Sequence, residues 1–308
     1  MLQKIPFGAG FTLPAALLAI AGVAVCAPPS APVGQMVITV ESRSGHSPAG
    51  LHPEDVMAYS GKTRVPVTDL QKLDGEHAGM QFFILLDDSS ATSSLGVHLP
   101  ELRDFVKSLP ATTEVAIGYM RSGGFDLVQG FTTDHTQAAA TLRLPGSVAG
   151  GNGSPYFALS YLAKHWPSQE ETGRRAVLML TDGIDRYYTN DSLDDPYANA
   201  AIRDVQKRAI GVYSIYLRGA GMYPGGGWAV NVGQSRLLQV TDQTGGRTYY
   251  EGLNNPVSLA PFLEDLDDRL ANQYKITLAT AARGPQSIKL RTEVPGLKIT
   301  GPARIYAE

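Results

Sequence analysis

Two apolar segments of the sequence each end in a carboxylate, and this pairing is its most informative feature for function. Residues 82–86, Phe-Phe-Ile-Leu-Leu, run into Asp87 and a string of hydroxyl side chains that includes Ser89. Residues 176–180, Ala-Val-Leu-Met-Leu, lead through a threonine into Asp182. If both segments are adjacent parallel strands, their carboxyl ends meet at one sheet edge, which is where ligands bind in open α/β sheets. Carboxylate and hydroxyl oxygens are hard ligands of the kind that Mg²⁺ prefers.

A glycine-rich loop, Gly-Gly-Asn-Gly-Ser-Pro, lies between the two segments and presents Ser154 just before a predicted helix. In this order Asp87, Ser89, Ser154 and Asp182 resemble the metal-ion-dependent adhesion site of von Willebrand factor type A domains. That site joins Asp-x-Ser-x-Ser to a distant Thr and a distant Asp. The resemblance covers roughly residues 81–272. It implies a site for Mg²⁺ or Mn²⁺ in which Ser154 takes the Thr position, and a protein ligand that offers a carboxylate to the ion.

The sequence departs from this pattern at two positions. Ala91 stands where the second Ser is expected, which removes one hydroxyl, and Ser154 lacks the stiffness of a β-branched Thr. A register that starts one residue later, with Asp88, Ser90 and Thr92, restores the hydroxyls. We favour Asp87 because Asp88 lies one residue beyond the apolar strand.

Asp87 and Ser89, and the Asp-Gly pair at 182–183, also have ordinary structural explanations. Asp and Ser are common helix caps, and Asp-Gly commonly forms turns. What favours a ligand site is the joint occurrence of these elements, in this order, in one alternating chain.

Alternating strand and helix patterns across residues 81–273 predict a Rossmann-like α/β domain of the type A kind, with a mainly parallel central sheet flanked by helices. The predicted strands after residues 82–87 are 114–120, with a hairpin partner at 125–131, then 176–181, 211–217 and 247–250. The predicted helices are 99–109, 157–166, 197–209, 235–243 and 261–272.

Small β segments flank this domain at both ends. Residues 33–80, which include Val-Ile-Thr-Val at 37–40, predict an N-terminal β module, and residues 274–308 predict a C-terminal β segment. The flanks resemble the acidobacterial VWFA-related family, which implies an exported, non-catalytic protein. A further hypothesis is that the two ends pair in one accessory sheet.

The first 27 residues predict export. Lys4 precedes an apolar stretch at 11–25 that is short for a membrane span and is followed by a proline-rich segment. We expect a signal peptide over residues 1–27, no transmembrane span in the mature chain, and a periplasmic or secreted protein. Cys26 is the only cysteine, so no disulfide holds the fold. Lipidation of Cys26 stays open as an alternative, although Val25 is not the small residue usual before a modified cysteine.

Composition and motifs narrow the class of function. The chain has 308 residues, a net charge of -3 and a pI of about 6.1, so no basic surface dominates and nucleic-acid binding is not expected. A Gly-x-Ser-x-Gly elbow and a His-Glu-x-x-His pair are both absent from the sequence, so we expect a non-catalytic protein. A hydrolase that uses the same acidic sheet edge is the alternative from another class.

Aromatic residues after the strands predict a partner-binding rim, because aromatics are enriched where protein interfaces bind most tightly. They are Tyr187, Tyr188, Tyr223 and Trp228. The sequence therefore predicts an exported binding or adhesion-type protein that engages a protein or surface ligand through a divalent cation. A metal-free scaffold in a cell-envelope assembly is the alternative within the same class. The oligomeric state does not follow from the sequence.

Overall fold

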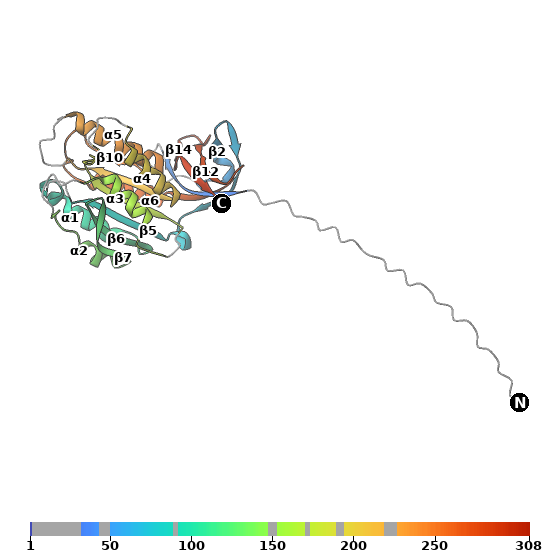
Figure 1. Ribbon diagram of the computed structural model, residues 1–308, viewed down its shortest axis with the longest axis horizontal. Helices are drawn as coiled ribbons and strands as arrows, with labels where there is room; N and C mark the ends of the chain where they lie inside the picture. Colours follow the sequence, from blue (N-terminus) through green and yellow to red (C-terminus); the bar gives the residue numbers. More distant parts are fainter. Residues whose placement is uncertain are drawn as a thin grey trace. The chain divides into compact units, whose positions relative to one another are not determined.

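The computed structural model describes Met1 and residues 32–42, 50–88, 92–146, 153–169, 173–188, 194–218 and 227–308 (Figure 1). The side chains of residues 92–94 also lie outside this description. Of the sequence-predicted site residues, Ser89 and Tyr223 lie outside it, as do Ser90 and Ala91. The predicted signal peptide lies outside it as well, apart from Met1.

A six-stranded sheet forms the centre of the α/β body, in the order β10-β9-β8-β5-β6-β7. All neighbouring strands are parallel except β7, which runs antiparallel to β6. Their bounds are β5 Met80–Asp87, β6 Thr113–Arg121, β7 Gly124–Thr132, β8 Arg175–Thr181, β9 Ile210–Tyr216 and β10 Thr248–Tyr249. Every residue of β5 is buried, as expected for a central parallel strand covered on both faces.

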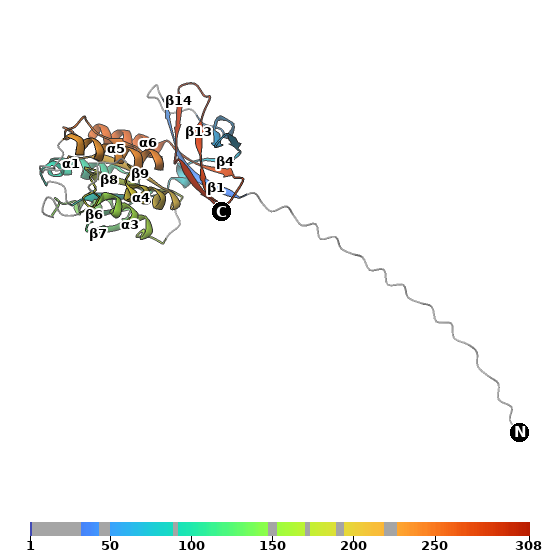
Figure 2. The same ribbon diagram turned by 45° about the horizontal axis from the view of Figure 1, so that its top comes forward.

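Period-two alternation along β5 divides the core into two layers. Phe82, Ile84 and Leu86 pack with α1, α2 and α6, whereas Phe83 and Leu85 pack with α3 and α4. The helices are α1 Thr92–Ser108, α2 His135–Ala140, α3 Pro155–Lys164, α4 Pro196–Lys207, α5 Gly227–Thr244 and α6 Ala260–Ala271. Figure 2 shows α6 and α4 on opposite sides of β8 and β9. The observed sheet and helices agree with the mainly parallel α/β fold that the alternation predicts.

The hairpin between β6 and β7 forms where the sequence predicts it. Ser122 and Gly123 both have positive φ, at 43° and 82°, which is the conformation of the two-residue turn that matches strand twist. Glycine supplies one of these positions without strain.

Two helices begin well before their predicted starts. The helix predicted at 99–109 begins at Thr92 and contains Pro100, and the helix predicted at 235–243 begins at Gly227. Gly233 explains the second difference, because a Cβ there would lie 2.3 Å from the carbonyl oxygen of Asp182. The glycine lets α5 lie directly against the loop after β8. From the sequence alone, however, a glycine at this position lowers the expectation of a helix.

Strands from the two flanks pair with each other beside this body. The larger accessory sheet has the order β14-β1-β11-β4, so β1 lies between two strands from the other end of the chain. Smaller ladders join β13-β2-β3 and β12-β15. The bounds are β1 Val33–Ser42, β2 Met57–Ser60, β3 Thr63–Val65, β4 Val67–Lys72, β11 Gln273–Ala279, β12 Gly284–Ser287, β13 Lys289–Arg291, β14 Leu297–Thr300 and β15 Arg304–Ala307. Short 3-10 turns occur at Pro53–Asp55 and Gly75–His77.

The accessory strands share one core. Met36, Ile38 and Val40 of β1 alternate inward and pack with Ile276 and Leu278 of β11. None of the helices within the described residues combines the length and apolar character that crossing a membrane requires.

Candidate functional site

The carboxyl edge of the central sheet brings together three of the four predicted ligand residues. β5 and β8 are parallel neighbours with Leu86 opposite Leu180, so Asp87 and Asp182 arrive at the same edge. Both are buried, at 3% and 1% exposed. The hydroxyl of Thr181 donates to Oδ2 of Asp87 at 2.7 Å. Thr181 is thus a hydroxyl of this edge that the sequence pattern did not single out.

Asp182 is paired with a cation from its own loop. Nη2 of Arg186 donates to Oδ2 of Asp182 at 2.7 Å, and the Ile184 amide donates to Oδ1 at 3.0 Å. The Arg186 side chain is only 8% exposed, so this ion pair is largely shielded from water. Burial raises the pKa of Asp182 to about 7; Arg186 opposes that rise and the nearby Asp87 adds to it.

Ser154 sits at the N-terminus of α3 and makes two hydrogen bonds. Its hydroxyl accepts from the Phe157 amide at 3.3 Å and donates to Oδ2 of Asp185 at 2.7 Å. The first bond makes Ser154 the N-cap of α3. Asp185 is fully enclosed and also accepts from the amides of Tyr187 and Tyr188. Asp185 is a residue of this edge that the sequence analysis did not identify. Its position three residues after Asp182 is a signal that could have indicated it.

Asp88, the first residue of the alternative register, faces a different part of the molecule. Its Oδ1 accepts from Nη1 of Arg143 at 3.0 Å and from the Gly146 amide at 2.7 Å. These partners follow α2. The structure therefore places Asp87, and not Asp88, on the side of β8.

The oxygen donors of this edge are of the type that Mg²⁺ takes, but among the described residues Asp182 and Ser154 already bond to other side chains. Oδ2 of Asp182 faces a guanidinium, and the Ser154 hydroxyl points its proton at Asp185. Within the described residues, no group of three or more His, Cys, Asp or Glu could hold a metal ion. A cation that bound Oδ2 of Asp182 would compete with the Arg186 guanidinium for that oxygen.

Three of the four residues of the predicted aromatic rim lie among the described residues, in the loop after β8 and in the first turn of α5. Tyr187 is 50% exposed and Trp228, in the first turn of α5, is 54% exposed, while Tyr188 is half-buried. The rings of Tyr187 and Phe157 meet edge to face with centroids 5.4 Å apart. Tyr188 meets Tyr197 of α4 in the same way at 5.8 Å. The two loop tyrosines are therefore held by aromatic partners on α3 and α4.

Comparisons with known proteins give structural likenesses only. No protein-family model and no curated protein matches the chain. An aerotolerance-related membrane protein from Bacteroides fragilis is 14% identical, with 62% of this chain and 98% of that one covered and a TM-score of 0.41. The vWF domain of the type V pilus tip protein Mfa5 from Porphyromonas gingivalis is 9% identical, with 61% and 94% covered and a TM-score of 0.42. The open conformation of the pilus adhesin SpaC from Lactobacillus rhamnosus GG is 8% identical, with 82% and 47% covered and a TM-score of 0.46.

The strand order and the helices on both faces come from this chain's own structure. They are consistent with the von Willebrand factor type A-like fold that the motif resemblance implies.

Proposed function

We propose that this chain is a non-catalytic protein that binds a protein ligand at the carboxyl edge of its central sheet without a metal ion. The ion pair between Arg186 and Asp182 carries the proposal. A buried carboxylate needs a positive partner, and here the chain supplies one four residues further on. The hydroxyl of Ser154 is likewise bonded to Asp185, so the chain itself provides partners for the candidate ligand oxygens of both residues.

Among the described residues, the aromatic rim is a part of this edge that reaches solvent. Tyr187 and Trp228 each expose about half of their surface, and aromatics of this kind bury large area at low entropic cost when a partner docks. Phe157 backs Tyr187, so the tyrosine is held in place before binding. A preformed aromatic contact supports binding to a folded protein surface.

Cross-linking and pull-down from an envelope extract of the source organism test the rim. The bait proteins are the wild-type chain, the double variant Tyr187→Ala/Trp228→Ala, and Tyr161→Ala as a control. Tyr161 is an exposed aromatic on α3 that lies outside the proposed rim. We expect one protein to be retained by the wild type and the control and lost by the double variant. Equal retention by all three baits would contradict the proposal.

Divalent-cation-dependent binding is the second candidate, and one observation favours it. Asp87 and Asp182 lie at the same edge, close enough for the charge of Asp87 to raise the pKa of Asp182. If Arg186 left, these oxygens could take Mg²⁺, which would then attract a carboxylate of the partner.

Calorimetric titration with Mg²⁺ and Mn²⁺ separates the two candidates. On the metal-free proposal the wild type shows no saturable binding, and Arg186→Ala gains a site that Arg186→Ala/Asp182→Asn lacks. Saturable binding by the wild type that is lost in Asp87→Ala and Asp182→Ala would instead establish the cation-dependent candidate.

Non-catalytic function and export are part of the proposal. Turnover of generic ester, phosphate or peptide substrates that disappears in Asp182→Ala would support the hydrolase alternative. Export rests on the sequence of residues 1–27. Mass spectrometry of the mature N-terminus would reveal cleavage after Cys26 or Ala27, or lipidation of Cys26.

A further inference from the structure

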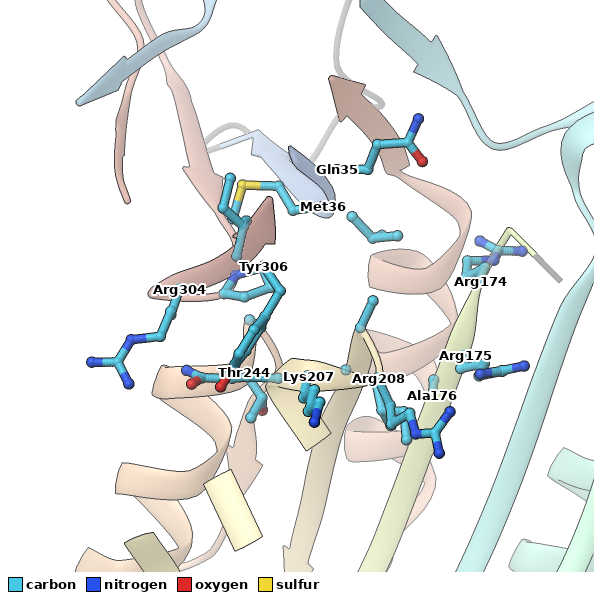
Figure 3. Close-up of a pocket in the computed structure, with 18 of the residues that line it drawn as sticks. Gln35, Met36, Arg174, Arg175, Ala176, Lys207, Arg208, Thr244, Arg304 and Tyr306 are labelled. Atoms are coloured by element: carbon cyan, nitrogen blue, oxygen red, sulfur yellow. The ribbon is translucent and has the colours of Figure 1, made fainter. Parts of the chain in front are cut away.

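A cavity of about 610 Å³ lies at the amino edge of the central sheet, at the other end of the strands from the carboxylates (Figure 3). Its lining comes from the start of β8 and β9, the last residues of α4 and α5, strand β1 of the larger accessory sheet, and strand β15 of the β12-β15 ladder. This volume falls in the range of roughly 300–1,000 Å³ that small-molecule sites occupy. The cavity is therefore sized for a small molecule rather than for a folded partner.

Positive side chains dominate the charged lining of this cavity. Arg174, Arg175, Lys207, Arg208 and Arg304 line it, against the single carboxylate side chain of Glu308. The C-terminal ends of α4 and α5 also meet the cavity, and each contributes roughly half a negative charge. Five cations exceed these negative contributions, so the cavity keeps a surplus of positive charge.

Two of the five cations already have structural roles. Arg174 is buried and donates to the carbonyl oxygens of Leu270 at 2.8 Å and Ala78 at 2.7 Å, and to the side chain of Gln273 at 3.2 Å. Arg175 lies over the Trp166 ring at 5.7 Å. These contacts fix the wall of the cavity and account for both residues without a ligand.

The other three cations have no such role. Lys207 and Arg208 are exposed at the end of α4, Arg304 is half-buried on β15, and none forms an ion pair with a carboxylate within the described part of the chain. Figure 3 shows Lys207 and Arg208 on one side of the cavity and Arg304 beside Tyr306 on another, with the Arg304 guanidinium directed away from Lys207 and Arg208. They come from the end of α4 and from β15, so the packing of the β12-β15 ladder against α4 places them around one cavity.

We infer that this cavity binds a small organic polyanion that carries carboxylate or phosphate groups. Guanidinium and ammonium groups on several sides of one cavity can reach two or more anionic groups of the same molecule. Met36 and Tyr306 supply an apolar surface for the carbon skeleton of such a ligand. The inference does not depend on the proposed function of the carboxyl edge.

Isothermal titration calorimetry of the chain with citrate and with pyrophosphate tests the inference, at constant low ionic strength because salt screens exposed charges. The test variant is Lys207→Gln/Arg208→Gln/Arg304→Gln. The matched control is Lys107→Gln/Arg121→Gln/Lys164→Gln, which removes the same charge from exposed cations that pair with Asp104, Asp126 and Asp204. Circular dichroism verifies that both variants fold. If the triple variant does not fold, Arg208→Gln alone takes its place.

We expect saturable binding of at least one probe to the wild type and to the control, with affinity reduced about tenfold or more in the cavity variant. Tighter binding of pyrophosphate would identify phosphate groups as the preferred chemistry, and tighter binding of citrate would identify carboxylates. Equal losses in the cavity variant and the control would overturn the inference, because charge alone would then explain binding. Absence of saturable binding of both probes to the wild type up to about 10 mM would overturn it as well.

Discussion

The two edges of the central sheet differ in whether their charged side chains have ion-pair partners. At the carboxyl edge Asp182 is buried and the chain places Arg186 against it. At the amino edge Lys207, Arg208 and Arg304 remain hydrated around a cavity and have no carboxylate partner among the described residues. Burial accounts for the difference, because a charge removed from water must be paired whereas a hydrated one need not be. At the carboxyl edge the chain supplies the cation that pairs with Asp182, whereas the cations at the amino edge are available to an external anion.

Removing the internal cation should have the largest effect on stability. Arg186→Ala leaves the buried Asp182 without its partner, so we expect the free energy of unfolding at about pH 9, where Asp182 is charged, to fall by about 3–5 kcal/mol. The control Arg121→Ala breaks the exposed pair with Asp126 and should cost no more than about 1 kcal/mol. Urea denaturation followed by circular dichroism measures both. Similar losses in the two variants would show that the Arg186 pair behaves as a surface pair.

The pH dependence of stability should carry the signature of Asp182. Its pKa is about 7 in the folded chain, against an ordinary value of 3.8, so the folded state holds the extra proton between these limits. The free energy of unfolding should therefore fall as pH rises toward about 7, by on the order of 2 kcal/mol between about pH 5 and pH 7. Urea denaturation of the wild type and Asp182→Asn across this range isolates the contribution. Equal dependence of the free energy of unfolding on pH in the two proteins would contradict this contribution of Asp182.

A change in the support of the carboxyl edge should have a smaller but clear effect. Gly233→Ala would place a Cβ 2.3 Å from the Asp182 carbonyl oxygen, so α5 must shift away from the loop. We expect a loss of about 1–3 kcal/mol in thermal or urea unfolding. Gly146→Ala is the control, because the nearest atom to its added Cβ is 3.5 Å away, on the flexible side chain of Arg143. An unchanged stability in Gly233→Ala would mean that α5 adjusts freely.

The smallest effect is expected at the amino edge. Arg304→Gln removes a half-buried cation without an ion-pair partner in the described chain, so its stability should change by less than about 0.5 kcal/mol. Thermal unfolding without added anion measures this. A larger loss would show that Arg304 supports the fold, and the contrast between the two edges would weaken.

The sequence predicted the elements of this fold more reliably than the partners within its site. The apolar runs before Asp87 and Asp182 identified β5 and β8, because buried parallel strands require such runs. The starts of α1 and α5 were wrong, since Pro100 and Gly233 resemble breakers in sequence yet lie inside helices. At Gly233 the cause is a close contact with a distant strand, which local pattern does not contain.

The chemistry of the site could be predicted only in part. The spacing of Asp87, Ser154 and Asp182 indicated one sheet edge, and the structure brings them there. The burial of Arg186 could not be read from the sequence, because its direction depends on how the loop folds over the edge. The basic cavity was equally hidden, since its cations are dispersed along the chain and only packing gathers them.

The central place of β1 in the accessory sheet constrains the order of folding. Val33 pairs with Ala279, and Thr39 pairs with both Gln273 and Thr300. Strand β1 therefore cannot complete its pairing until β11 and β14 have been synthesised. Closing such a long loop is slow compared with forming the local βα units between them. During synthesis or translocation, β1 would remain an open edge that another chain could pair with. A chaperone that covers the emerging N-terminal strand would therefore raise the yield of this protein more than one that acts on the α/β body.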